Sequence, residues 1–126
     1  MRVLLEEKAF FVNRPEALPL YQRFVERLHS EFADVTIRMK KTQISFSNKH
    51  IFAVVSLPFR KIKSRPAIYI IVSFGLNHRV KHPRIIEAVE PYPNHWTHHT
   101  LVVQKEDVDD VLMNWIRSAY VFSMIK

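Results

Sequence analysis

Cysteine is absent from this sequence of 126 residues, which excludes disulfides, thiolate nucleophiles and cysteine-based zinc sites. Glycine occurs once, at Gly75, so a glycine-rich phosphate loop and a dinucleotide-binding fingerprint are also excluded. No apolar run approaches the ~20 residues of a membrane-spanning helix. The acids Glu6 and Glu7 come too early for a secretory signal peptide. We therefore expect a cytoplasmic protein with no membrane partner.

Acidic residues are missing from residues 35–86, which hold eleven lysines and arginines and three histidines. The flanking segments are slightly acidic, so the net charge of +7 resides in the middle of the chain. A long basic stretch is typical of proteins that bind a polyanion. A solvated charged rim with no partner explains the same composition, and the sequence leaves that alternative open.

The apolar pattern predicts a single α+β domain over residues 1–126. Apolar residues recur with helical spacing from Tyr21 to Phe32, which predicts a helix over 19–34. Alternation then predicts strands over 35–39, 43–47 and 51–57, and the apolar run 67–74 suits a central strand. The first twelve residues suit a short helix or an arm.

The last third of the chain predicts a short helix, a strand and a long helix. Pro83 can open a helix over 84–89, and residues 100–104 suit the last strand. Asp107 or Asp109 can cap a final helix, whose apolar residues keep helical spacing as far as Phe122. The expected fold is a two-layer sandwich, with a mostly antiparallel sheet and the N- and C-terminal helices packed on one face.

Two motifs carry a family resemblance. The run Glu90-Pro-Tyr-Pro-x-x-Trp-Thr-His-His, followed by Asp-Val-Asp-Asp-x-x-x-x-Trp-Ile-x-x-Ala-Tyr120, resembles the C-terminal signature of a bacterial domain-of-unknown-function family (DUF5655-like), over about residues 18–122. More distantly, Trp96-Thr-His-His-Thr-Leu-Val102 is similar to the MmcQ/YjbR family. That similarity implies a CyaY-like sandwich and DNA binding, although the basic residues that usually precede the tryptophan are replaced here by Pro93-Asn94-His95.

The histidine-rich segment 91–99 is one candidate site. Its side chains His95, Trp96, His98 and His99 suit a ligand or protein contact. In a strand, His98 and His99 would point to opposite faces, and no carboxylate follows Glu90 in this segment, so we predict no metal and no cofactor. A purely structural motif is the alternative, in which two prolines stiffen the chain and Trp96 closes the end of the core.

The basic loops on either side of the central strand are the other candidate site. The residues expected to contact phosphates are Arg60, Lys61, Lys63, Arg65, Arg79, Lys81 and Arg84. The two loops either meet or lie at opposite ends of the sheet. No catalytic residue is assigned, because no Gly-x-Ser-x-Gly turn is present, but the sequence leaves general acid–base work by His95 or His98 open. The sequence predicts a non-enzymatic nucleic-acid-binding module, or alternatively a protein- or small-ligand-interaction module at residues 91–99, and it indicates no oligomeric state.

Overall fold

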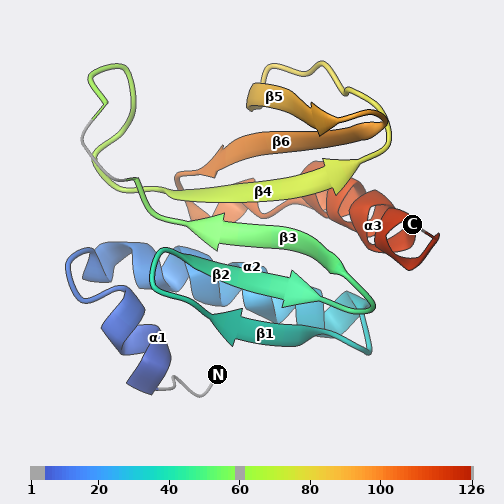
Figure 1. Cartoon of the computed structure of the whole chain (residues 1–126). Coiled ribbons are helices and arrows are strands. Elements are labelled where there is room, and N and C mark those ends of the chain that lie inside the picture. The colour runs from blue at the N-terminus through green and yellow to red at the C-terminus, as the bar shows by residue number, and fades with distance from the viewer. Residues whose placement is uncertain (1–4, 59–61, 126) are drawn as a thin grey trace.

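A computed structural model describes residues 5–58 and 62–125 of the chain (Figure 1). The helices are α1 (Leu5–Phe10), α2 (Leu18–Glu31) and α3 (Asp110–Ile125), with short 3-10 turns η1 (Pro15–Ala17) and η2 (Lys105–Asp107). The strands are β1 (Thr36–Met39), β2 (Gln43–Ser47), β3 (Ile51–Ser56), β4 (Ile70–Leu76), β5 (Ile85–Tyr92) and β6 (His95–Val102). No helix within these described ranges is long and apolar enough to cross a membrane.

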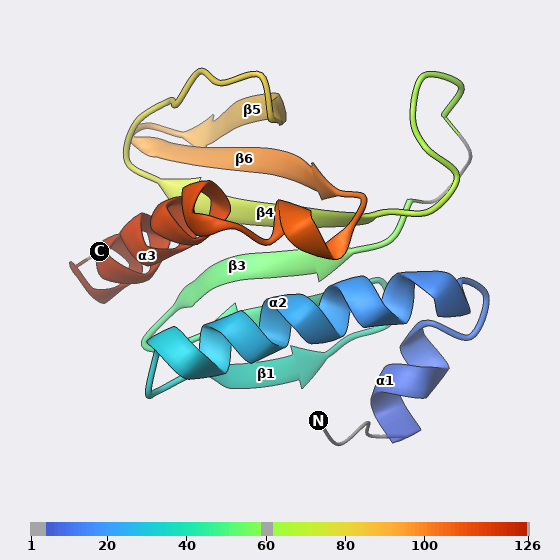
Figure 2. The same ribbon diagram turned by 180° about the vertical axis from the view of Figure 1, so that it is seen from behind.

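The six strands form one antiparallel sheet in the order β1-β2-β3-β4-β6-β5. Helices α2 and α3 lie side by side on one face of this sheet (Figure 2), and none of the described residues forms a helix on the other face (Figure 1). The expected α+β two-layer sandwich is therefore confirmed. A closer likeness to the CyaY-like fold stays a prediction.

Both long helices form where their apolar spacing predicts. Helix α2 buries one face, which includes Tyr21, Phe24 and Leu28, and Pro19 lies in its first turn, where a missing N–H costs nothing. Helix α3 begins after Asp109, whose Oδ1 accepts a hydrogen bond from the Leu112 backbone N at 3.0 Å. Of the two predicted caps, Asp109 is therefore the one that caps this helix.

The core lies between the helices and the inner face of the sheet. Strand alternation places Ile44, Phe46, Val72 and Phe74 against the helices, each 1% exposed or less. Phe46 packs edge-on against Phe24 of α2, with 5.4 Å between the ring centroids. Each buried side chain of this size contributes about 1.5–3 kcal/mol of transfer free energy, so this layer fixes the position of both helices.

The predicted helix over 84–89 is wrong, because residues 85–89 form the first part of β5. Strand β6 begins at His95 and not at residue 100, and β5 pairs with it in an antiparallel hairpin. Asn94 closes the turn with a φ of 63°, a value that asparagine tolerates better than most residues, and its backbone N donates to Glu90 Oε2 at 3.0 Å. Pro91 is accommodated because β5 is an edge strand.

Candidate functional site

Strand β6 divides the histidine-rich segment between the two faces of the sheet. His98 is fully buried on the helix side and stacks on Phe74, with 5.1 Å between ring centroids and planes 9° apart. His99 lies on the uncovered face, where its Nδ1 is 2.7 Å from Ser73 Oγ. The two neighbouring histidines therefore point to opposite faces, as strand geometry requires.

His98 has a structural role. Its Nε2 accepts a hydrogen bond from the Val80 backbone N at 2.9 Å, which fastens the loop between β4 and β5 to the core. Burial lowers the pKa of His98, although the carbonyl groups of Phe74 and Trp96 oppose the shift. Nδ1 of His98 is buried and has no hydrogen-bond partner among the described residues. Burial therefore favours the neutral form of this ring, because the charged form would lose its hydration.

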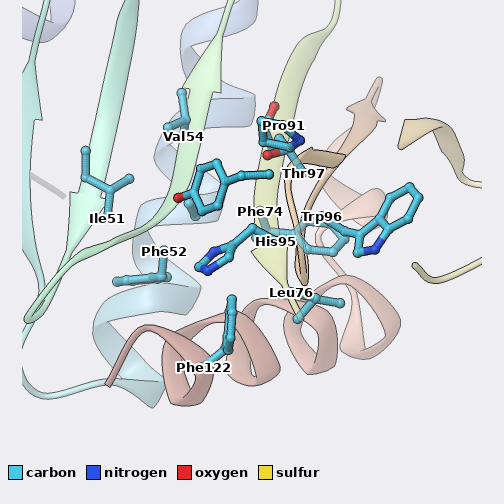
Figure 3. A pocket seen from close by; sticks show the side chains of 14 residues that line it. Ile51, Phe52, Val54, Phe74, Leu76, Pro91, His95, Trp96, Thr97 and Phe122 are labelled. Carbon is cyan, nitrogen blue, oxygen red and sulfur yellow. The ribbon is translucent and has the colours of Figure 1, made fainter. Parts of the chain in front are cut away.

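A hollow of about 150 Å³ opens at the end of the sheet where β3 begins and β4 ends. We call it the hairpin hollow, because the turn between β5 and β6 forms one of its walls. The ring of His95 lies 4.2 Å from that of Tyr92 and 5.2 Å from that of Phe122 of α3, measured between centroids. Figure 3 shows Phe52, His95 and Phe122 gathered on one side, with Trp96 pointing away from them.

Gly75 forms part of the floor of the hairpin hollow. A Cβ atom added at Gly75 would meet no atom within 4 Å, and its φ is not positive. The backbone therefore does not require glycine at this position. Gly75 pairs with Thr97 on the face that carries Ser73 and His99, so the missing side chain leaves space on the uncovered face.

The two basic loops lie at opposite ends of β4 (Figure 1). Lys63 and Arg65 precede this strand, and Arg79 and Lys81 follow it. A strand of seven residues separates the two groups by about 20 Å at ~3.3 Å per residue. The predicted residues Arg60 and Lys61 lie outside the described residues.

Arg84 is engaged inside the molecule. Its Nη1 donates to Asp109 Oδ1 at 2.7 Å, and its Nη2 donates to the Asp107 carbonyl at 2.6 Å. Burial acts to raise the pKa of Asp109, but the hydrogen bonds from Leu112 and Arg84 outweigh it and hold this pKa below its ordinary value. Arg84 thus fastens β5 to the start of α3, and a phosphate would have to compete with Asp109 for it.

The remaining described residues of the basic set are more accessible. Arg79 lies over the Trp96 ring, with 5.8 Å from the guanidinium carbon to the centroid, and Arg65 lies over Tyr69 at 5.9 Å. Lys63 and Lys81 are exposed. For metal ions, the described residues bring together no group of three or more histidine, aspartate, glutamate or cysteine side chains that could hold one.

The structure also brings His99, a predicted site residue, together with two residues that sequence reasoning missed. Ser73 of β4, His99 of β6 and Glu87 of β5 face one another on the uncovered side of the sheet. Ser73 Oγ lies 2.7 Å from His99 Nδ1, and His99 Nε2 lies 4.0 Å from Glu87 Oε1. No spacing in the sequence signals this line, because it depends on β6 lying between β4 and β5.

Comparison with known proteins places the chain in a family but attaches no activity to it. Residues 7–123 match the family described as a domain of unknown function (DUF5655). No curated protein and no solved structure gave a significant match, and the more distant similarity to the MmcQ/YjbR family stays a prediction. The matched region includes β4, the β5–β6 hairpin and nearly all of α3, and therefore every described residue of both candidate sites. The chain belongs to the DUF5655 family.

Proposed function

We propose that this domain is a binding module whose site is the hairpin hollow, and that it takes a small apolar ligand or an apolar side chain of a partner protein. The observation that carries the proposal is the unfilled space above Gly75. Gly75 lines the hairpin hollow together with aromatic residues of β3, the β5–β6 hairpin and α3. A hollow of this volume suits a group the size of benzene.

The energetics of Gly75 support this function. A glycine within a strand is less stable than alanine by roughly 0.5–1 kcal/mol, because glycine loses more conformational freedom on folding. The chain carries its only glycine at a position that has room for a side chain and an ordinary φ. Since stability alone favours a larger residue there, the retained space supports a role in binding.

Phenol titration followed by amide NMR tests the proposal. We expect concentration-dependent shifts at Gly75, His95 and Thr97, because phenol combines a ring of suitable size with one hydroxyl group. Gly75→Val should abolish these shifts without loss of thermal stability, because valine fills the floor and favours the strand. The matched control is Val121→Ala, which changes an exposed apolar residue of α3. Phenol shifts that persist in Gly75→Val would contradict the site.

Nucleic-acid binding through phosphate contacts is the second candidate function. It is supported by the acid-free stretch 35–86 and by the accessible cations Lys63, Arg65, Arg79 and Lys81. Because the two basic loops lie about 20 Å apart, a single nucleic acid would have to run along β4. That length corresponds to about six base pairs of duplex DNA. This candidate therefore predicts phosphate contacts by both loops, and the charge-reversal variants discussed below test it.

A further inference from the structure

Ser73, His99 and Glu87 form a hydroxyl–imidazole–carboxylate line on the uncovered face of the sheet. His99 is the cross-strand partner of both other residues, Ser73 in β4 and Glu87 in β5. Cross-strand partners project their side chains to the same face. The register of the three strands therefore holds the line together, and the side chains extend from rigid strands and not from loops.

The order of the groups is that of a nucleophile, its base and the group that orients the base. With the proton on Nε2, His99 Nδ1 accepts the Ser73 hydroxyl hydrogen at 2.7 Å, and the Nε2–H group faces the Glu87 carboxylate at 4.0 Å. Such constellations are identified by geometry and roles and not by position in the sequence. A proton that leaves Ser73 would give an imidazolium that the Glu87 carboxylate stabilises.

Burial of a serine on this face does not by itself require a histidine. Ser45 lies on the same face in β2 and is 1% exposed, yet its hydroxyl has no hydrogen-bond partner among the described residues. The Ser73–His99 pair is therefore not a feature of every buried serine on this face.

Ser73 also lines the hairpin hollow. Gly75 is two residues further along β4 on the same face, so the empty space begins beside the Ser73 hydroxyl. Thr97, the cross-strand partner of Gly75, supplies a hydroxyl group diagonally across from Ser73. We propose that the hairpin hollow and the Ser73–His99–Glu87 line form one site that hydrolyses small carboxylic esters, with the acyl group seated over Gly75. This inference rests on the proposed ligand site.

The reaction has two steps, which need only water as a second reactant. Ser73 Oγ attacks the carbonyl carbon of the ester while His99 Nδ1 takes the hydroxyl proton, and the Thr97 hydroxyl donates a hydrogen bond to the oxyanion. The bond to the alcohol oxygen then breaks, and His99 returns the proton to the leaving alkoxide. Water attacks the acyl–Ser73 ester next and gives its proton to His99. The bond between the acyl carbon and Ser73 Oγ then breaks, His99 returns the proton to Ser73 Oγ, and the product leaves as a carboxylic acid.

Labelling with a fluorophosphonate probe, mapped by peptide mass spectrometry, tests this inference. We expect a single adduct on Ser73. The adduct should be lost in Ser73→Ala and should form at least about 100-fold more slowly in His99→Ala, the scale of general-base catalysis. Glu87 is a positioning residue, so Glu87→Gln should slow labelling and Glu87→Asp should restore it. The matched control is Ser56→Ala, a half-buried serine on the same face, which should label at the wild-type rate.

Absence of labelling in the wild-type protein, or an adduct that persists in Ser73→Ala, would overturn the inference. Phenol titration of the unlabelled protein separates this failure from failure of the proposed ligand site. Phenol shifts at Gly75 without probe labelling would retain the binding function and reject the hydrolase. Absence of both phenol shifts and labelling would reject the two together.

Discussion

His98 and His99 are neighbouring histidines in β6 that differ in burial and in hydrogen-bond partners. His98 is fully buried on the helix side of the sheet, and its Nε2 accepts a hydrogen bond from the Val80 backbone N. His99 has a side chain 28% exposed and reaches a hydroxyl group and a carboxylate. A single step along a strand therefore separates a residue that stabilises the fold from one that is available for chemistry.

Strand β4, next to β6, shows the same difference between its two faces. The inner face of β4 presents Val72 and Phe74 to the helices, whereas the outer face presents Ser73 and Gly75 to the hairpin hollow. Substitutions on the inner face should change stability, and substitutions on the outer face should change binding. Variants at corresponding positions on the two faces can test that separation.

The largest effect on stability is expected for His98→Ala. This change removes a fully buried ring and leaves the Val80 N–H without its acceptor, which together cost about 2–4 kcal/mol. His99→Ala should cost less than about 1 kcal/mol, because its ring is partly exposed. Urea denaturation of the two variants measures both free energies. Equal losses of stability would contradict the division between the faces.

Asp109→Ala should have the next largest effect. The carboxylate caps α3 and binds Arg84, so its removal should cost about 1–2 kcal/mol. Asp110→Ala is the matched control, because the neighbouring Asp110 side chain is 92% exposed and should cost about 0.5 kcal/mol or less. Thermal melts of both variants measure these losses of stability. An Asp109 variant as stable as the control would show that the contact between Arg84 and Asp109 contributes little.

The two helices that form one layer of this fold were predictable, because a long run of apolar residues at helical spacing indicates a helix without knowledge of its partners. Tyr21 to Phe32 and Val108 to Phe122 keep helical spacing over several turns, and both segments form the expected helices. The β5–β6 hairpin was not predictable, because Ile85, Ala88 and Val89 fit a helical face as well as a strand, and two prolines beside Tyr92 suggested a break. Only the hydrogen-bonding partner, β6, decides between the two structures.

The candidate site was harder to predict than the fold. The sequence indicated His95, but Tyr92, Gly75 and Phe122 join it only when β4, the hairpin and α3 meet. The seven predicted phosphate contacts were chosen by charge alone. Charge along the chain does not show that Arg84 binds Asp109, nor that β4 separates the two loops.

A pH titration provides a smaller but more specific test of the inner face. Because burial lowers the pKa of His98 in the folded state, the unfolded chain binds this proton more readily near pH 6. The resulting stability is fully present above about pH 6.5, the ordinary pKa of histidine, and is lost as pH falls through the folded pKa. His98→Phe keeps the stacking on Phe74 without a titrating group. Its unfolding free energy should therefore fall less steeply between pH 7.5 and 5 than that of the wild type, and equal slopes would contradict the assignment.

The smallest effect on stability is expected for the basic loops. Lys63 and Lys81 are exposed, so Lys63→Glu and Lys81→Glu should each change the unfolding free energy by less than about 0.5 kcal/mol. If the loops contact phosphates, each substitution should still weaken binding to a labelled 20-base-pair duplex. Each should also reduce the slope of log affinity against log salt by about 0.9. Fluorescence anisotropy over a salt series measures both quantities.

Lys8→Glu is the matched control for these variants, because Lys8 is also exposed but lies in α1, which contacts the edge strand β1, with β2 and β3 between that strand and β4. If its effect equals that of Lys81→Glu, the duplex responds to net charge alone and the loops form no site. If only Lys81→Glu reduces the slope, the phosphates lie at the end of β4 next to Gly75, and the two proposed functions then share one end of the sheet. If Lys63→Glu reduces the slope equally, the duplex spans the length of β4. Absence of duplex binding by the wild-type protein at low salt would leave the loops as a solvated rim and the hairpin hollow as the remaining candidate.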